Sequence, residues 1–234
     1  MGTSGSTVLL PDRESTGASR SQSAPCDACG GLGYVRCGDR MRECDCLVVG
    51  DALGKIPPRY RAAQLEDFPL KTQGEVRAWC DAMGDGLFLF GGTGTGKTHL
   101  ACGLLVALAR TYRGSRFARC VEVYSSIRAT YSHGSEVELL EGYIRPDLLV
   151  LDDLAAGGLT DFERRMTLDI LDRRCNGLRP TVVTSNWNLE QIAARLDDRI
   201  ASRLSSFKQL LLVGLDRRPL VQRAAKEVVV AKEL

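Results

Sequence analysis

The sequence lacks a strong net charge, a long hydrophobic run and an internal repeat. Its 31 Lys and Arg nearly balance 29 Asp and Glu, and the resulting charge of +2 does not by itself indicate a nucleic acid or an acidic membrane as partner. No apolar stretch approaches the roughly 20 residues that span a bilayer, and the Ser- and Gly-rich start has no apolar signal core. We therefore expect a protein without a membrane segment that resides in the cytoplasm.

One segment has the pattern of a nucleoside triphosphate site. An apolar strand is expected at 87–90, and it is followed by G-x-x-x-x-G-K-T and an apolar helix. Glycines let backbone N–H groups surround a β-phosphate, Lys97 would bridge the β- and γ-phosphates, and the Thr98 hydroxyl would ligate Mg²⁺. A merely flexible glycine loop is disfavoured, because the motif joins a strand to a helix. The predicted nucleotide-binding residues are Gly91, Gly92, Thr93, Gly94, Thr95, Gly96, Lys97, Thr98 and His99.

A second apolar strand, expected at 148–151, ends in two carboxylates, Asp152 and Asp153. This is a Walker B pattern. Asp152 would hold Mg²⁺ together with Thr98, and Asp153 would orient or polarise the attacking water as a catalytic residue. Two aspartates after a strand can also form a turn or a helix cap, but the phosphate loop upstream favours the metal role.

Two further polar groups follow predicted strands. The strand at 181–185 ends at Asn186, which would touch the γ-phosphate or its attacking water at the carboxyl edge of the sheet. The alternative for this residue is a turn-forming Asn. Arg218 comes shortly after a last strand at 209–213, where a basic side chain would reach the nucleotide of its own subunit.

Two arginines, Arg199 and Arg203, lie four residues apart and therefore on one face of a helix. In a head-to-tail assembly, one of them would enter the ATP site of a neighbouring subunit and stabilise the charge of the transferring phosphoryl group. Spacing alone favours an ion pair with Asp198 or Glu190 instead.

From residue 56 onward, apolar strands alternate with amphipathic helices, which predicts an α/β domain with a parallel sheet flanked by helices. We expect a disordered tail at 1–25, a cysteine-rich element with its linker at 26–55, the nucleotide-binding domain at 56–218, and a C-terminal helix or tail at 219–234. The expected strands are 87–90, 119–124, 148–151, 181–185 and 209–213, and the expected helices are 75–83, 98–110, 126–132, 137–143, 161–174, 189–195 and 199–205.

In a reducing compartment the nine cysteines are not expected to form disulfides, so their clustering is more informative than their number. Cys26-x-x-Cys29 and Cys44-x-Cys46 present four thiolates from two tight turns at a spacing that zinc ribbons use. We predict tetrahedral Zn²⁺ there, with free thiols as the alternative. Cys37, in the middle of the loop, is expected to be a spare cysteine, with replacement of Cys44 or Cys46 as the alternative. The remaining cysteines are predicted to be small buried side chains: Cys80, Cys102, Cys120 and Cys175.

A segment at 123–131 combines Tyr124, Arg128 and Tyr131. Aromatic and basic side chains together stack on bases and pair with phosphates, so single-stranded DNA is one interpretation. The other is that the tyrosines are packing residues of an amphipathic helix.

Together, the motifs resemble the DnaC/IstB-like branch of AAA+ ATPases, and in particular helicase loaders of the DnaC and DnaI type. The resemblance covers about 56–218 and implies a P-loop NTPase core in which Asn186 is a sensor-1 residue, Arg203 with Arg199 nearby is the arginine-finger candidate, and Arg218 has a sensor-2-like role. The segments that carry it are 56–60 (IPPRY), 65–68 (LEDF), 91–101 (GGTGTGKTHLA), 148–154 (LLVLDDL), 184–186 (TSN) and 198–204 (DRIASRL).

The resemblance also implies cofactors and partners. ATP, Mg²⁺ and Zn²⁺ would be bound, and the N-terminal zinc element would contact a replicative hexameric helicase while the ATPase domain holds single-stranded DNA and assembles as a homo-oligomer. Many AAA+ proteins carry Asp-Glu at the Walker B end, so Asp153 implies slow, switch-like hydrolysis. Two alternatives stay open: an IstB-like helper of DNA transposition that assembles on duplex DNA, and a non-enzymatic adaptor that binds ATP without hydrolysing it.

Overall fold

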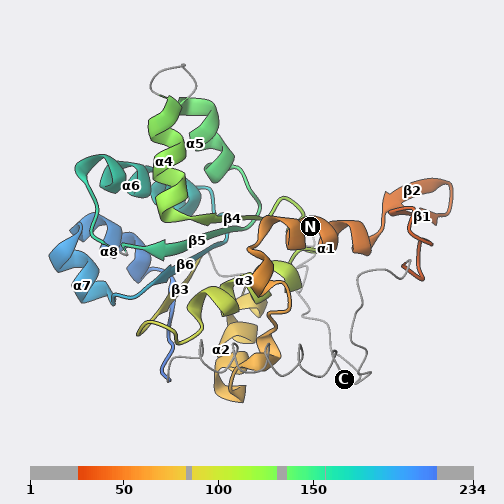
Figure 1. The fold of residues 1–234 in the computed structure, drawn as a ribbon, viewed down its shortest axis with the longest axis horizontal. Helices are drawn as coiled ribbons and strands as arrows, with labels where there is room; N and C mark the ends of the chain where they lie inside the picture. Colours follow the sequence, from red (N-terminus) through yellow and green to blue (C-terminus); the bar gives the residue numbers. More distant parts are fainter. Residues whose placement is uncertain (1–25, 83–85, 131–135, 156, 215–234) are drawn as a thin grey trace, which may run out of the picture.

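The computed structural model describes residues 26–82, 86–130, 136–155 and 157–214, so the expected tails and Arg218 lie outside the described residues. A parallel sheet of five strands in the order β4-β5-β6-β3-β7 forms the centre (Figure 1). This confirms the predicted fold class. The strands are β3 (Gly86–Phe90), β4 (Arg116–Arg119), β5 (Leu149–Leu154), β6 (Thr181–Ser185) and β7 (Lys208–Leu211).

Helices cover both faces of the sheet. Figure 1 shows α2 and α3 on one side of the strands, and α4 to α8 on the other. No helix of the described residues is long and apolar enough to cross a membrane. The helices are α1 (Asp45–Lys55), α2 (Leu70–Asp81), α3 (Lys97–Ala107), α4 (Cys120–Ala129), α5 (Glu136–Ile144), α6 (Asp161–Asn176), α7 (Leu189–Arg195) and α8 (Asp198–Ser205), with short 3₁₀ turns η1 (Pro58–Tyr60) and η2 (Leu65–Asp67).

The interior strand β3, which lies between β6 and β7, shows why the sheet is apolar on both faces. Leu87 and Leu89 lie in the hydrophobic core beneath α2 and α3, whereas Phe88 lies in the second core beneath α4 to α8. Successive side chains of a strand point to opposite faces, so a strand buried between two helical layers is apolar at every position. The phosphate-loop strand is therefore fixed from both sides.

The prediction of a strand at 119–124 is wrong, because most of this segment is helical. Strand β4 ends at Arg119, and α4 begins at Cys120. The buried residues of α4 are Cys120, Val123, Tyr124 and Ile127, which are spaced three and four apart as on one face of a helix. The β-branched and aromatic residues suggested a strand, but their helical spacing decides the structure.

The linker expected after the cysteine-rich element is helical, because the chain from Asp45 to Lys55 forms α1. Val48, Ala52 and Ile56, each four residues apart, are buried in the same core as α3. Before α1, an antiparallel hairpin of β1 (Tyr34–Cys37) and β2 (Arg40–Glu43) projects from the body of the molecule (Figure 1). The cysteine-rich element is thus joined to the nucleotide-binding domain by a packed helix.

Candidate nucleotide site and cysteine cluster

The predicted nucleotide-site residues lie in or directly after the carboxyl ends of three adjacent parallel strands. Strand β6 lies between β3, which leads into the phosphate loop, and β5, which carries Asp152 and Asp153. Asn186 follows β6 directly and is exposed. The carboxyl ends of parallel strands meet at one edge of a sheet, where open α/β sheets bind ligands. The sheet order brings these three groups together.

The phosphate loop adopts backbone conformations that only glycine takes easily. Gly91, Gly94 and Gly96 have φ of 142°, 81° and 98°. A Cβ on Gly91 would overlap the carbonyl oxygen of Leu212, whose N–H donates to Phe90 O at 2.8 Å. The loop is therefore held between β3 and the chain that leaves β7.

Lys97 lies folded within its own loop. Its Nζ donates to Gly91 O at 2.9 Å and to Gly92 O at 2.7 Å, and the residue is buried. Nearby, Thr95 Oγ1 donates to Gly92 O at 3.0 Å. Helix α3 begins at Lys97. The first backbone N–H groups of a helix have no acceptor within that helix, and here they lie near the ammonium group of Lys97. This combination suits the phosphates of a nucleotide.

Asp152 is buried and connected to two hydroxyl groups. Thr98 Oγ1 and Thr184 Oγ1 each donate to its Oδ1 at 2.8 Å. Burial raises the pKa of Asp152 above its ordinary value, and the two hydroxyl groups partly offset this rise. A carboxylate and a threonine hydroxyl at this distance are the oxygen ligands that Mg²⁺ accepts, so both predicted residues fit the ion.

Asp153 has a left-handed backbone, with φ of 63°. Its N–H donates to Thr184 Oγ1 at 2.8 Å, and the register of β5 against β6 shifts between Leu151 and Leu154. The side chain is partly exposed at the end of the strand, where the sequence predicts the residue that orients water. Sequence reasoning quoted Thr184 only as part of a motif and gave it no role.

Arg199 and Arg203 of α8 form ion pairs, but not with the carboxylates that the sequence spacing predicts. Arg199 binds Asp197, which caps the helix, with Nη2 to Oδ2 at 3.0 Å, and Arg203 pairs with Asp172 of α6. The predicted partners Asp198 and Glu190 are therefore wrong. Helical spacing considers only carboxylates a few residues away, whereas Asp172 lies 31 residues from Arg203 in the sequence. Both arginine side chains are about half or more exposed, at 71% and 47%.

His99 contacts the segment that precedes α2. Its Nε2 lies 2.6 Å from Asp67 Oδ2, and its ring contacts the rings of Tyr60 and Phe68, with centroids 6.2 Å and 5.9 Å away. These three partners belong to the IPPRY and LEDF segments. The sequence predicts His99 in the nucleotide site and does not predict its contacts with these two segments.

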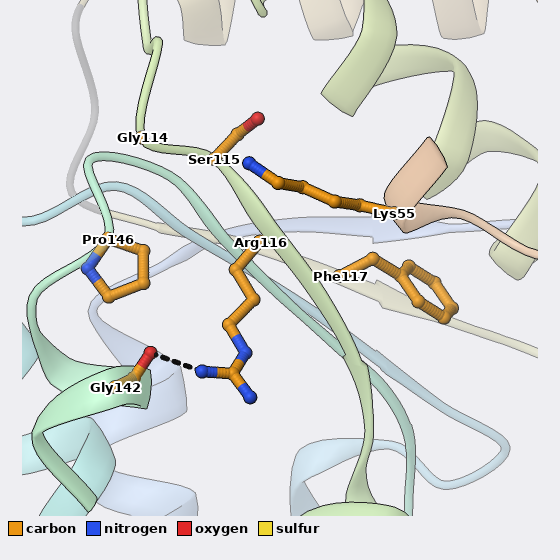
Figure 2. A pocket seen from close by; sticks show the side chains of 7 residues that line it. All are labelled: Lys55, Gly114, Ser115, Arg116, Phe117, Gly142 and Pro146. Carbon is orange, nitrogen blue, oxygen red and sulfur yellow. Dashed lines mark hydrogen bonds between the residues drawn. The ribbon is translucent and has the colours of Figure 1, made fainter. Parts of the chain in front are cut away.

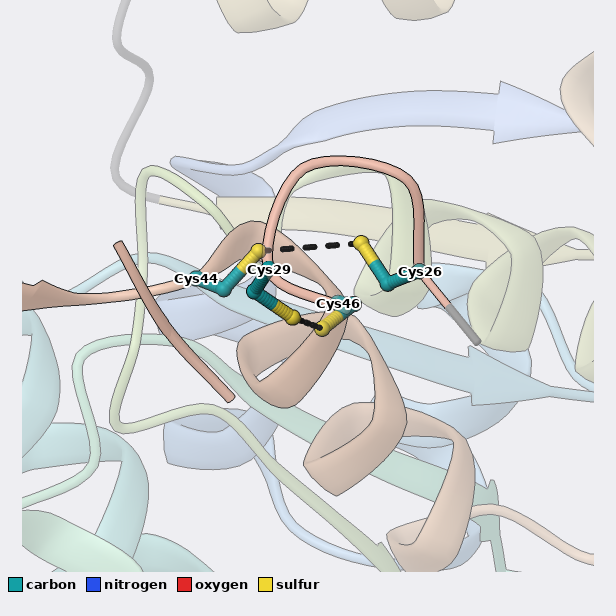
Figure 3. A group of neighbouring side chains, drawn as sticks. All are labelled: Cys26, Cys29, Cys44 and Cys46. Carbon is teal, nitrogen blue, oxygen red and sulfur yellow. Dashed lines mark hydrogen bonds between the residues drawn. The ribbon is translucent and has the colours of Figure 1, made fainter. Parts of the chain in front are cut away.

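The structure brings together the four predicted metal ligands, Cys26, Cys29, Cys44 and Cys46, whose sulfur atoms all lie within 4.8 Å of one another. Figure 3 shows the four side chains converging. The sulfur atoms are 3.8 Å apart in the Cys26–Cys44 pair and 3.5 Å apart in the Cys29–Cys46 pair. Tetrahedral Zn–S bonds of about 2.3 Å place sulfur atoms about 3.8 Å apart. The four thiols therefore fit a zinc ion.

The electrostatics of the cluster agree with this fit. Gly33 N–H donates to Cys29 Sγ at 3.3 Å and lowers the pKa of Cys29 to about 7, whereas the contact with Cys29 raises the pKa of Cys46 to about 12. Adjacent thiolates repel one another, and a divalent cation removes that repulsion. Cys37 is exposed on the hairpin, outside the cluster, where it accepts from Arg42 Nε at 3.2 Å.

The burial of individual side chains tests two other sequence predictions, one for the cysteines outside the cluster and one for Tyr124. Cys80, Cys102 and Cys120 are buried as expected, and Cys175 is partly buried. Tyr124 is buried with its hydroxyl 2.6 Å from Thr167 Oγ1, so for this residue the DNA interpretation is wrong and the packing interpretation is correct. Tyr131 lies outside the described residues.

A pocket of about 400 Å³ lies at the other end of the sheet (Figure 2). It surrounds the start of β4, and Lys55 and Arg116 line it. Lys55 pairs with Asp51 at 2.6 Å, and Arg116 donates to Gly142 O at 2.8 Å. Its cations are thus already engaged within the chain, and the pocket is separate from the nucleotide site.

Comparison with known proteins places this geometry in a family. The model of the IstB-like ATP binding protein family matches residues 75–205. The replicative helicase loader DnaC of Escherichia coli K12 is 28% identical over 160 residues, which are 64% of this chain and 65% of the loader. The chain thus spans slightly less than two thirds of that relative.

Two further likenesses point the same way. A putative ATP-binding protein in an insertion sequence of Mycobacterium tuberculosis, Rv3427c, is 29% identical over 69% of this chain and 64% of its own length. The crystal structure of the DnaC helicase loader has a TM-score of 0.60 at 24% identity, and covers 67% of this chain and 100% of that one. The chain belongs to the IstB-like ATP binding protein family, and it shares the fold of the DnaC helicase loader.

Proposed function

We propose that this ATPase is a helicase loader in DNA replication, which binds a replicative hexameric helicase and single-stranded DNA and uses ATP binding and slow hydrolysis as its switch. The observation that carries the proposal is the four-cysteine cluster ahead of the ATPase domain. Such a cluster resembles the N-terminal zinc-binding element of DnaI-type loaders, and IstB-like transposition helpers usually lack one. Helicase and DNA as partners imply a cytoplasmic protein.

The nucleotide site supports ATP as the ligand of the switch. Lys97 would leave the carbonyls of its loop and bridge the β- and γ-phosphates, while Thr98 and Asp152 would hold Mg²⁺. The ion would neutralise charge on the phosphates. Asp153 would orient the attacking water and Asn186 would contact the γ-phosphate or that water. The shorter carboxylate of Asp153, where many AAA+ proteins carry Glu, agrees with slow turnover.

A neighbouring subunit would complete the site. Arg203 is 47% exposed, and surface ion pairs contribute only about 0–1 kcal/mol, so the Arg203 side chain can leave Asp172 at little cost. We propose it as the arginine finger of a head-to-tail homo-oligomer, with Arg199 as the second candidate. Arg218 would contact the nucleotide of its own subunit.

The second candidate is an ATPase helper of DNA transposition, which the family model and the insertion-sequence relative favour. Purification of tagged protein from its native cell separates the two: a loader recovers a hexameric helicase, and a transposition helper recovers a transposase. Nucleic acid gives an independent measurement. Single-stranded DNA should stimulate hydrolysis by a loader, whereas preferential stimulation by duplex DNA would contradict the loader.

Two variants test the site itself. Lys97→Ala should abolish ATP binding in a titration, and Arg203→Ala should reduce DNA- or helicase-stimulated hydrolysis while ATP binding is retained. Full stimulated turnover of Arg203→Ala would eliminate the finger assignment, and normal ATP affinity of Lys97→Ala would eliminate the phosphate-loop assignment.

A further inference from the structure

The two Walker B carboxylates face a single residue of the neighbouring strand. In the register of β5 and β6, Leu151 pairs with Val183 and Leu154 pairs with Ser185. Two residues, Asp152 and Asp153, therefore lie across from Thr184 alone. Two residues opposite one is the definition of a β-bulge, a feature that re-aims side chains near active sites.

The hydroxyl of Thr184 bonds to both aspartates. Its Oγ1 donates to Asp152 Oδ1 at 2.8 Å and accepts from the N–H of Asp153 at 2.8 Å. A hydroxyl has one hydrogen to donate and lone pairs that accept, so it makes both bonds at once. Thr184 is 1% exposed, so water does not readily replace it.

The bulge needs such support because its backbone is strained. Asp153 has φ of 63°, a conformation that persists only where the surroundings enforce it. On the far side of the bulge, Ser185 Oγ donates to Leu154 O at 2.8 Å. Adjacent hydroxyl side chains of β6 thus hold the bulge at both ends.

Thr98 cannot hold Asp152 equally well during catalysis. It too donates to Asp152 Oδ1, but its hydroxyl is itself a proposed Mg²⁺ ligand. Thr184 comes from strand β6, and among the described residues its hydroxyl bonds only to the two aspartates. Residues that orient a metal ligand from behind typically change metal affinity or activity 10–100-fold when lost.

We propose that Thr184 is a positioning residue for ATP hydrolysis. Its single hydroxyl orients the carboxylate of Asp152 toward the metal and sets the backbone from which Asp153 acts on the attacking water. The proposal rests on the proposed roles of Asp152 and Asp153. It also links the strand that ends at Asn186 to the Walker B strand.

The experiment compares Thr184→Val, which keeps the shape but removes the hydroxyl, with Thr184→Ser, which keeps the hydroxyl. Thr184→Val should lower kcat about 10–100-fold and raise the Mg²⁺ concentration at half-maximal rate by a similar factor. In EDTA, Thr184→Val should bind a fluorescent ATP analogue with the affinity of the wild type. The increase in affinity that Mg²⁺ gives the wild type should be lost in the variant. Thr184→Ser should stay within about threefold of the wild type in every measurement.

Thr181→Val is the matched control, because Thr181 is another buried threonine of β6 whose hydroxyl bonds elsewhere, to Arg174 and Arg179. It should lower the urea midpoint without altering the Mg²⁺ dependence. Equal effects of the two valine variants on Mg²⁺ dependence, or no rescue by Thr184→Ser, would overturn the proposal.

Asp152→Asn separates this proposal from the site on which it rests. If Thr184→Val resembles the wild type while Asp152→Asn has lost its Mg²⁺ response, only the role of Thr184 is refuted. If Asp152→Asn keeps the full Mg²⁺ response, the metal assignment is wrong, and the role of Thr184 is refuted with it.

Discussion

Replacement of Gly91 by alanine should damage the phosphate loop far more than the same replacement one residue later. At Gly91 a Cβ would overlap the carbonyl oxygen of Leu212 and lie 3.1 Å from its carbonyl carbon. Leu212 cannot easily retreat, because its N–H is bonded to Phe90 O. At Gly92, the nearest atom to a Cβ is Thr95 Cγ2 at 3.8 Å, an ordinary contact.

Two terms set the size of the effect. A non-glycine residue at φ of 142° costs about 1–3 kcal/mol, and an overpacked methyl group costs a further 1–3 kcal/mol or so. Their sum, about 2–6 kcal/mol, is a large part of the 5–15 kcal/mol or so that stabilises a typical domain. Gly91 O also accepts from Lys97 Nζ, so any displacement of the loop moves the lysine that we assign to the phosphates.

The measurement is urea unfolding followed by circular dichroism, with ATP titration of the folded variants. Gly91→Ala should lose about 2–6 kcal/mol of unfolding free energy and most of its ATP affinity, while Gly92→Ala should stay within about 1 kcal/mol of the wild type. Unfolding free energies of the two variants within about 0.5 kcal/mol of each other would refute the steric reasoning.

Two further predictions concern buried groups. Arg174 is fully buried and donates to the last carbonyls of α5 and to Pro180 O, so Arg174→Met should lower the free energy of unfolding in urea by about 3 kcal/mol or more. Arg173 is about half exposed, and Arg173→Met should lower it by less than about 1 kcal/mol. Equal losses in the two variants would contradict the capping role of Arg174. Burial raises the pKa of Cys80 and Cys120 to about 12, so iodoacetamide at pH 8 should spare both and label Cys37. If the cluster binds zinc, its four cysteines should be labelled only after chelation; mass spectrometry locates the labels, and equal labelling with and without chelator would contradict a metal there.

The phosphate loop and Walker B strand could be predicted because each combines a short motif with the right period on either side. The apolar run before Gly91 and the helix from Lys97 both lie in sequence where the chemistry needs them. The cysteine cluster could be predicted for a similar reason, since both of its turns lie within 21 residues of sequence, from Cys26 to Cys46.

Contacts between distant segments could not be predicted. The partner of Arg203 is on α6, and the partner of His99 lies 32 residues upstream. The bulge at Asp153 depends on the register of β5 against β6, which a single strand does not encode. Sequence reasoning therefore named candidate residues for the site but not the Thr184 hydroxyl group that bonds to two of them.

The packing of α1 connects the two candidate sites. This helix begins at Asp45, inside the cysteine cluster, and its buried side chains share one core with α3, the helix that begins at Lys97. Arg110, shortly after α3, pairs with Asp45 at 3.2 Å, and Arg113 pairs with Glu43 at 3.1 Å. A close-packed interior transmits displacement. A metal bound by the cluster would fix the first turn of α1 and would therefore act on the same core that supports the phosphate loop, so the two sites are not independent structural units.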